Sequence, residues 1–155
     1  MADGGLGLLL QAMDTTWAHD GWHPPLTAAI EGMTAAQAAW QARPDTLTAR
    51  QFVQHVAYWK EAALRTLDGQ DGGEPEGGNE ATFGAPGDGA DEAGWQAAID
   101  RLHRAHAALV VGAKALPAAR AADPKVIGLL LGLANHDAYH GGEIVQLRKL
   151  QGAWH

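Results

Sequence analysis

The sequence contains no cysteine among its 155 residues. Disulfide bonds, zinc ribbons, thiolate nucleophiles and iron–sulfur clusters are therefore excluded. A metal site in this chain has to use histidine, aspartate or glutamate side chains. The sequence has eight histidines, so the residue types for such a site are available.

Positive charge is also scarce, with 11 lysines and arginines against 18 aspartates and glutamates. The formal net charge of −7 and a pI near 5.5 leave no basic surface to neutralise phosphate groups. Binding to nucleic acid or to an anionic membrane is therefore not expected. Long apolar runs are missing too, since Val126–Ala134 is far shorter than the roughly 20 residues of a membrane span. No basic leader precedes the short run Leu6–Leu10, so we expect a cytoplasmic protein without a signal peptide.

What remains is a chain with 46% apolar and 19% charged residues. These proportions are typical of a globular protein, and this length is sufficient for one domain with a substantial core. Much of the apolar fraction is alanine, a strong helix former. No stretch shows sustained alternation of apolar and polar residues. The sequence therefore predicts a single all-α domain over residues 1–155.

Apolar residues recur at helical spacing in four long segments. These segments lie near residues 6–21, 48–67, 91–116 and 125–151. Thr48 is the expected N-cap of the second segment, and Asp88 or Asp91 that of the third. Thr34 and Gln37 have the spacing of a capping box, which predicts a short helix directly after Thr34. The apolar residues at positions 26, 29, 30 and 33 predict another short helix before it. We interpret the pattern as a four-helix bundle.

Residues 69–94, between the second and third long helices, differ in composition from the rest of the chain. The stretch is polar and rich in glycine, which predicts a long, flexible surface loop. Phe83 and Pro86 are the expected anchors of this loop onto the bundle. Loops of this length are often functional lids, and plain disorder is at least as common.

His136 and His140 are four residues apart on the last predicted helix, so both rings project from one face. Such a pair can chelate a metal ion, and it can equally belong to a solvated face. Two features favour a metal site. The pair lies within an apolar stripe, where unpaired imidazoles are costly to bury. Gly141 and Gly142 follow inside a strong helix, which suggests the close approach of a ligand or a neighbouring helix. Glu143 shares the face of the pair and can serve as a ligand, as a hydrogen-bond acceptor for a ligand, or as a base.

A third ligand is needed, because two histidines hold a divalent ion only weakly. His55, in the middle of the second long helix, is the best candidate. By pattern alone, a lone histidine beside an apolar face is more often a hydrogen-bonded core residue. His103 and His106 form a rival pair, but Arg101 and Arg104 flank His103 and predict a solvated position for it.

Two stretches of the chain resemble the DinB-like superfamily of metal-binding four-helix bundles, which includes the YfiT-type proteins. Thr48–Lys60 has a histidine in the context H-hydrophobic-x-x-W, and His136–Gly152 begins with H-x-x-x-H-x-G. The resemblance implies that the metal ligands are His55, His136 and His140. The family usually has glutamine after this glycine, whereas the present chain has Glu143, a carboxylate that can alter the chemistry near the ion.

Three neutral imidazoles on one divalent ion leave a coordination position open, as in catalytic zinc sites. Relatives in the superfamily include thiol-dependent S-transferases. The resemblance therefore implies a metal-dependent transferase with a low-molecular-weight thiol as cofactor and a small molecule as substrate. A metal-dependent hydrolase with Glu143 as base, and a non-catalytic, stress-related metal-binding bundle, are the alternatives. Zinc, nickel and iron(II) are all compatible with three histidines. A homodimer is compatible with so short a bundle.

Overall fold

The structure is a computed structural model that describes residues 3–19 and 21–154. Within these ranges the chain forms helices and no strands. The long helices are α1 (Asp3–Ala18), α4 (Ala49–Leu67), α6 (Glu92–Lys114) and α8 (Pro124–Leu150). The short ones are α2 (Leu26–Ile30), α3 (Ala35–Ala38), α5 (Gly78–Ala81) and α7 (Ala118–Ala121). The all-α four-helix bundle is therefore confirmed, while α5 and α7 are additions to the predicted elements.

Side-chain caps set the ends of several helices. Thr48 and Thr34 each form a complete capping box, with Gln51 and Gln37 respectively. Asp91 caps α6 by accepting a hydrogen bond from the backbone N–H of Gly94. These caps agree with the sequence patterns that predicted them. The predicted loop 69–94 is shorter than expected, because α6 already begins at Glu92.

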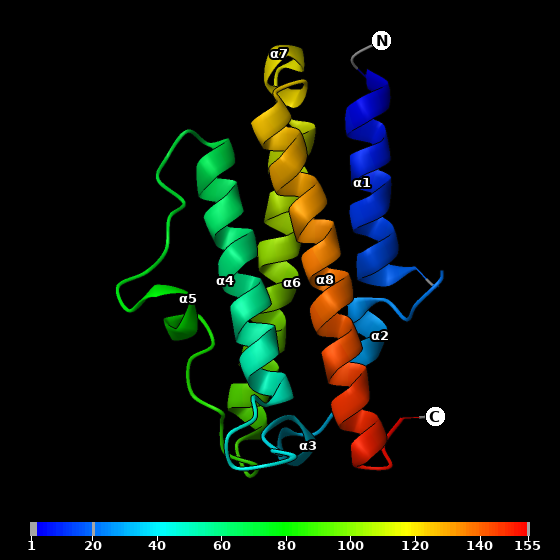
Figure 1. Cartoon of the computed structure of the whole chain (residues 1–155), viewed down its shortest axis with the longest axis vertical. Helices are drawn as coiled ribbons and strands as arrows, with labels where there is room; N and C mark the ends of the chain where they lie inside the picture. The colour runs from blue at the N-terminus through cyan, green and yellow to red at the C-terminus, as the bar shows by residue number, and fades with distance from the viewer. Residues whose placement is uncertain (1–2, 20, 155) are drawn as a thin grey trace.

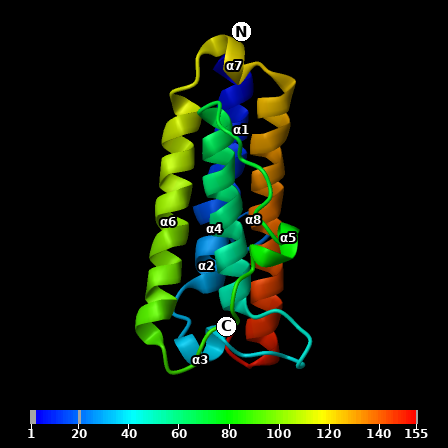
Figure 2. The ribbon, with the colours of Figure 1, turned by 90° about the vertical axis from the view of Figure 1, so that its left-hand side faces the viewer.

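The long helices do not simply alternate in direction. Figure 1 shows α1 and α8 running downward, whereas α4 and α6 both run upward and lie side by side, as Figure 2 also shows. Two parallel neighbours cannot be joined by a tight turn, so the chain must return along the whole length of the bundle between them. The glycine-rich segment after α4 is this crossover, and it includes α5.

Side chains of α4 hold the crossover along much of its length. Side chains between Thr48 and Trp59 bind the crossover, and residues later in this stretch mostly pair with residues earlier in the crossover. The hydrogen bonds join Thr48 to Pro86, Gln51 to Gly84, Gln54 to Phe83 and Ala85, His55 to Thr82, Tyr58 to Gly73, and Trp59 to Asn79. Phe83 is buried, as predicted for an anchor, whereas Pro86 is exposed and accepts a hydrogen bond from Thr48 through its carbonyl oxygen. The crossover therefore brings Thr82 and Phe83 to the middle of α4, beside His55.

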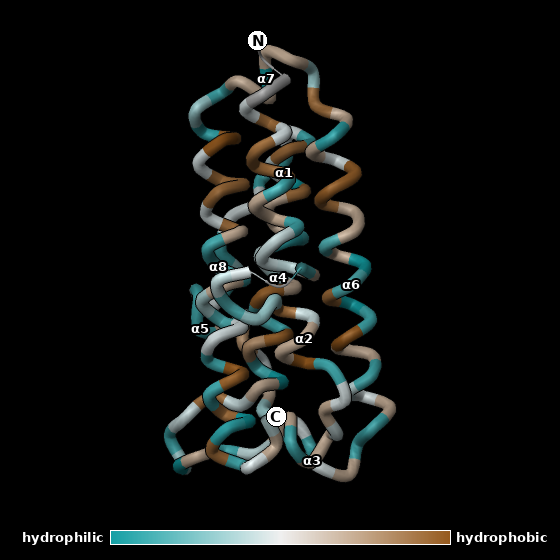
Figure 3. Tube along the Cα trace, turned by 90° about the vertical axis from the view of Figure 1, so that its right-hand side faces the viewer, coloured by the Kyte–Doolittle hydropathy of each residue, from teal (hydrophilic) through white to brown (hydrophobic). Residues whose placement is uncertain are grey.

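The core has two apolar clusters stacked along the bundle, and brown apolar segments recur along the long helices in Figure 3. One cluster contains Trp95 and Ile144, and the other contains Leu109 and Leu130. On α4, α6 and α8 a buried polar layer separates them, formed by Lys60, His106 and Asp137. None of the described helices has the length and apolar character needed to cross a membrane.

The two glycines after His140 have different surroundings. A Cβ atom on Gly141 would lie 3.6 Å from Cα of Leu26, so this buried glycine faces the closely packed α2. A Cβ atom on Gly142 would meet nothing within 4 Å. The expected close approach of a neighbouring helix therefore applies to Gly141, and nothing in the structure explains Gly142.

Candidate metal centre

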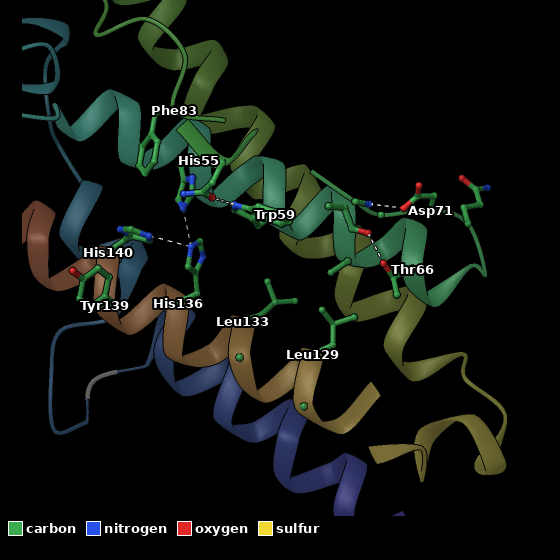
Figure 4. A pocket seen from close by; sticks show the side chains of 18 residues that line it. His55, Trp59, Thr66, Asp71, Phe83, Leu129, Leu133, His136, Tyr139 and His140 are labelled. Carbon is green, nitrogen blue, oxygen red and sulfur yellow. Dashed lines mark hydrogen bonds between the residues drawn. The ribbon is translucent and has the colours of Figure 1, made fainter. Parts of the chain in front are cut away.

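His55 on α4 faces His136 and His140 on α8, and Figure 4 shows the three rings pointing toward one another. Nε2 of His136 lies 3.0 Å from Nε2 of His55 and 3.0 Å from Nε2 of His140. One nitrogen atom from each of the three rings can serve as a ligand, and these three nitrogens all lie within 4.8 Å of one another. The structure therefore brings together the three histidines that the sequence analysis selected.

A hydrogen-bond chain fixes the tautomer of His55. Thr82 Oγ1 donates its only proton in a hydrogen bond to the carbonyl oxygen of Asn79, at 2.6 Å. The same Oγ1 lies 2.5 Å from Nδ1 of His55, and it can only accept there. Nδ1 of His55 must then carry the ring proton, which leaves Nε2 with a lone pair directed at the cluster.

Glu143 acts on His140 in the same way. Its Oε2 lies 2.6 Å from Nδ1 of His140, three residues away on α8. A carboxylate accepts a hydrogen bond from Nδ1–H, so Nε2 of His140 also presents a lone pair. Glu143 thus contacts the side of the ring that faces away from the cluster. Nδ1 of His136 is buried and has no hydrogen-bond partner among the described residues.

Two Nε2 lone pairs therefore converge on the Nε2 atom of His136. A proton on that third nitrogen could serve only one of the two neighbours, whereas a cation satisfies all three. Burial lowers the pKa of His55 to about 4 and that of His136 to about 3, with His140 adding to both shifts. The rings of His55 and His136 are thus neutral near pH 7, which is the form that binds metals. The donor set fits a divalent ion that accepts imidazole nitrogen, such as zinc.

Aromatic side chains surround the histidines. Phe83 from the crossover stacks on His55, with ring centroids 3.9 Å apart and planes within 1° of parallel. Phe52 lies 5.2 Å from the ring of His140, and Trp59 contacts His55 edge-on at 6.4 Å. These contacts restrict the rotation of the histidine rings, and Phe83 covers one face of His55.

The other side of the cluster opens into a pocket of about 910 Å³ between α4, α8 and the crossover. All three histidines contribute to its wall, together with Trp59 and Phe83. Figure 4 shows the histidines at one end and Thr66 and Asp71 at the other, with Leu129 and Leu133 between them. An ion at the histidines would therefore be accessible to a small molecule.

The other histidines among the described residues are not part of this cluster. His103 is exposed, as its flanking arginines predicted, and His106 is buried. His106 stacks on Trp17 at 3.9 Å, and its Nδ1 lies 3.3 Å from Nζ of Lys60. Lys60 in turn forms an ion pair with Asp137 at 2.6 Å. His106, the buried member of the rival pair, therefore belongs to the buried polar layer.

Sequence reasoning missed the supporting residues Thr82, Lys60 and Asp137. Thr82 gave no signal, because it is one polar residue in a long polar stretch. Lys60 and Asp137 did give a signal, because each is a charged residue at a position in the apolar stripe of its helix.

Fold and site together define the class of protein: an all-α bundle in which two helices direct three histidines at one point. A model of the DinB superfamily matches residues 24–144, a segment that contains all three histidines. The match covers more than half of the chain, and the protein belongs to the DinB superfamily. Comparisons with curated proteins and with solved structures give no match.

Proposed function

We propose that His55, His136 and His140 bind one divalent metal ion and that the protein is a metal-dependent thiol S-transferase. The observation that carries this proposal is the convergence of three Nε2 atoms at the wall of an open pocket. Three imidazoles leave a coordination position for an outside group. When bound, such an ion lowers the pKa of a thiol held there and raises the thiolate fraction at neutral pH.

The surrounding residues have distinct tasks in this reaction. Thr82 and Glu143 hold two imidazoles in the metal-binding tautomer, and Phe83 covers one face of His55. The thiol proton leaves to solvent through the open pocket. The sulfur then forms a bond to an electrophilic carbon of the second substrate, whose leaving group departs with the bonding electrons. The partners are thus a low-molecular-weight thiol and a small electrophile.

A metal-dependent hydrolase is the second candidate, and the position of Glu143 makes it the weaker one. A hydrolase benefits from a base within hydrogen-bond reach of the attacking water. Glu143 contacts the far side of His140 and does not line the pocket. Among the described lining residues the carboxylate is Asp71, which lies at the opposite end from the histidines (Figure 4). A thiol has a lower intrinsic pKa than water and needs less help from a base.

Elemental analysis of the purified protein is the first test, and it also distinguishes zinc, nickel and iron(II). We expect one ion per chain in the wild type and a sharp loss in His136→Ala and His140→Ala, with His55→Ala close behind. His103→Ala is the matched control, because this exposed histidine lies outside the cluster. Full metal occupancy in the variant that carries all three histidine-to-alanine substitutions would end the proposal.

Cobalt substitution then tests the chemistry. Added thiol is expected to change the visible spectrum of the cobalt-loaded protein, and the chain should stay helical without metal. The non-catalytic alternative predicts the reverse. In that case metal removal collapses the helical signal, and neither thiol nor ester substrates are turned over.

A further inference from the structure

The pocket extends well beyond the histidines. Its wall on α8 runs from His140 back to Gly128, and its wall on α4 runs from His55 to Thr66. Eight residues separate His136 from Gly128, which corresponds to about 12 Å along a helix. A thiol bound at the histidines would fill only one end of this space. The remainder is therefore available for the body of a larger molecule.

The floor of the extension is formed by glycines of α8. Gly128 and Gly132 both line the pocket, and a Cβ atom on either would meet nothing within 4 Å. Glycine inside a helix costs roughly 1 kcal/mol relative to alanine, and no close contact here requires it. What the two glycines provide is open space, one and two turns away from His136.

The middle of the extension is apolar, and its far end is polar. Leu129 and Leu133 face Ala62, Ala63 and Trp59 across the pocket. Beyond them lie the polar residues Thr66, Gln70 and Asp71. The described lining residues include no lysine or arginine, so nothing there would balance a negative charge on a ligand.

We propose that this extension binds an elongated small molecule with an apolar body, an end that reaches the metal centre, and no negative charge at the other end. The assignment of the first end rests on the proposed function, which it deepens by naming a substrate class. A body of roughly ten carbon atoms spans the distance, given bond lengths near 1.5 Å. An uncharged or cationic terminus suits the carboxylate of Asp71 and the hydroxyl of Thr66.

Two homologous series of probes test this proposal with the zinc-loaded and the metal-free protein. Neutral alkyl hydroxamic acids carry a metal-chelating head, and 1-alkanols of the same lengths do not. Affinities are measured by calorimetry. In both series the affinity is expected to rise roughly twofold to fourfold per added methylene until the chain reaches Thr66. Only the hydroxamic acids should gain further affinity from zinc.

The variant Gly132→Leu places a side chain in the apolar middle of the pocket. It leaves the histidines intact and removes a helix-weakening glycine, so the fold and the zinc content should be retained. In this variant the affinity is expected to lose its dependence on the chain length of the probe, while the shortest hydroxamic acid binds as before. Gly7→Leu is the matched control, since Gly7 is also an exposed helical glycine with nothing near its Cβ, but lies on α1.

Terminal charge provides a second measurement. A carboxylate at the end of a long hydroxamic acid should weaken binding, and an ammonium group should not. Asp71→Asn is expected to reduce the difference in affinity between the carboxylate-ended and ammonium-ended probes by only a fewfold. The effect is small because Asp71 is exposed and solvent screens its charge.

The outcomes separate this inference from the proposed function. If hydroxamic acids bind through zinc with no effect of chain length and none of Gly132→Leu, the extension is not a substrate site, although the metal centre stands. If both series bind according to length but zinc adds nothing, the extension stands and the metal-dependent function fails. A preference for the carboxylate terminus would overturn the assignment of charge.

Discussion

At the scale of single residues, the histidines depend on partners that face away from the cluster. Thr82 accepts a hydrogen bond from Nδ1–H of His55 and thereby keeps the Nε2 lone pair of this ring available. Thr82→Val keeps the shape of the side chain and removes this acceptor. We expect the zinc affinity to fall about 10-fold to 100-fold, as for other residues that orient a ligand. Competition with a chromophoric chelator measures the change.

Thr66→Val provides the control for this variant. Thr66 lies on the same wall of the pocket, but its hydroxyl donates to the carbonyl oxygen of Ala62 within α4. Its loss should leave the zinc affinity unchanged. Equal affinities for the wild type and Thr82→Val would show that the threonine does not orient His55.

Glu143 allows a similar test that also separates orientation from base catalysis. Glutamine keeps an oxygen that can accept from Nδ1 of His140, although a neutral acceptor is weaker than a carboxylate. Glu143→Gln is therefore expected to lower the zinc affinity by less than about tenfold, and Glu143→Leu by more. Turnover per bound zinc should be the same in Glu143→Gln as in the wild type. A large loss of turnover with full zinc content would favour the base role and the hydrolase.

The sequence predicted these residues unequally. The spacing of His136 and His140 on an apolar stripe was sufficient to identify the pair. The pattern around His55 favoured a core histidine, and its selection as the third ligand rested mostly on the family resemblance. Thr82 could not be found, because its role depends on how the crossover lies on α4. A single sequence contains no direct information on that contact.

At the scale of helices, the buried polar layer connects α4, α6 and α8. Lys60 follows Val53 and Val56 in the apolar stripe of α4, so a charged residue occupies a core position. Its side chain is 0% exposed, and that of its partner Asp137 is 1% exposed. Burial lowers the pKa of Lys60 and raises that of Asp137, and their ion pair opposes both shifts. Since Asp137 is adjacent to His136, the pair also fixes the register of α8 against α4.

Lys60→Met tests the energetic importance of this pair. The change keeps the length of the side chain but leaves the carboxylate of Asp137 buried without a cation. We expect a loss of about 3–5 kcal/mol in the free energy of unfolding, measured with urea on the metal-free protein. Adding Asp137→Leu should recover much of this loss, because it removes the isolated charge.

The ion pair of Arg101 with Glu61 serves as the comparison. It also joins α4 to α6 and is bidentate, at 2.8 Å for both contacts. Its side chains are 40% and 35% exposed, so solvent screens the interaction. Arg101→Met is expected to cost no more than about 1 kcal/mol. Similar losses for Lys60→Met and Arg101→Met would contradict the proposed effect of burial.

Helix positions were predictable to within a few residues, but the direction of packing was not. The caps at Thr48 and Asp91 are local, so the sequence contains them directly. Hydropathy patterns show which face of a helix is buried but not which helix covers it. The parallel arrangement of α4 and α6 had one indirect signal, the length of the polar segment between them. We interpreted that segment as a surface loop, whereas the structure shows that it returns along α4.

At the scale of the whole molecule, several histidines are buried in the neutral form. Burial lowers the pKa of His106 to about 3, and the nearby charge of Lys60 adds to this shift. The pKa values of His55 and His136 are lowered as well, to about 4 and about 3. In the unfolded chain all three return to about 6.5. Below pH 6.5 the unfolded state therefore binds protons that the folded state does not.

Stability rises with pH wherever the unfolded state binds more protons, so it must fall as the pH drops from about 6.5 toward 4. Each of these histidines contributes up to about 1.4 kcal/mol per pH unit in this window. Above pH 6.5 their contribution to stability is fully present. Asp137, with its raised pKa, acts in the opposite direction. The measured slope of stability against pH is therefore the sum of the contributions of several groups.

The difference between the wild type and His106→Phe isolates one of these groups. Phenylalanine keeps the stacking on Trp17 and does not titrate. Urea unfolding of the metal-free protein at several pH values between 5 and 6.5 should give a smaller slope for the variant, by up to about 1.4 kcal/mol per pH unit. Parallel pH profiles for the wild type and His106→Phe would mean that His106 takes up a proton in the folded protein. The buried layer would then accommodate a second positive charge beside Lys60, and its stability could not depend on neutral histidine.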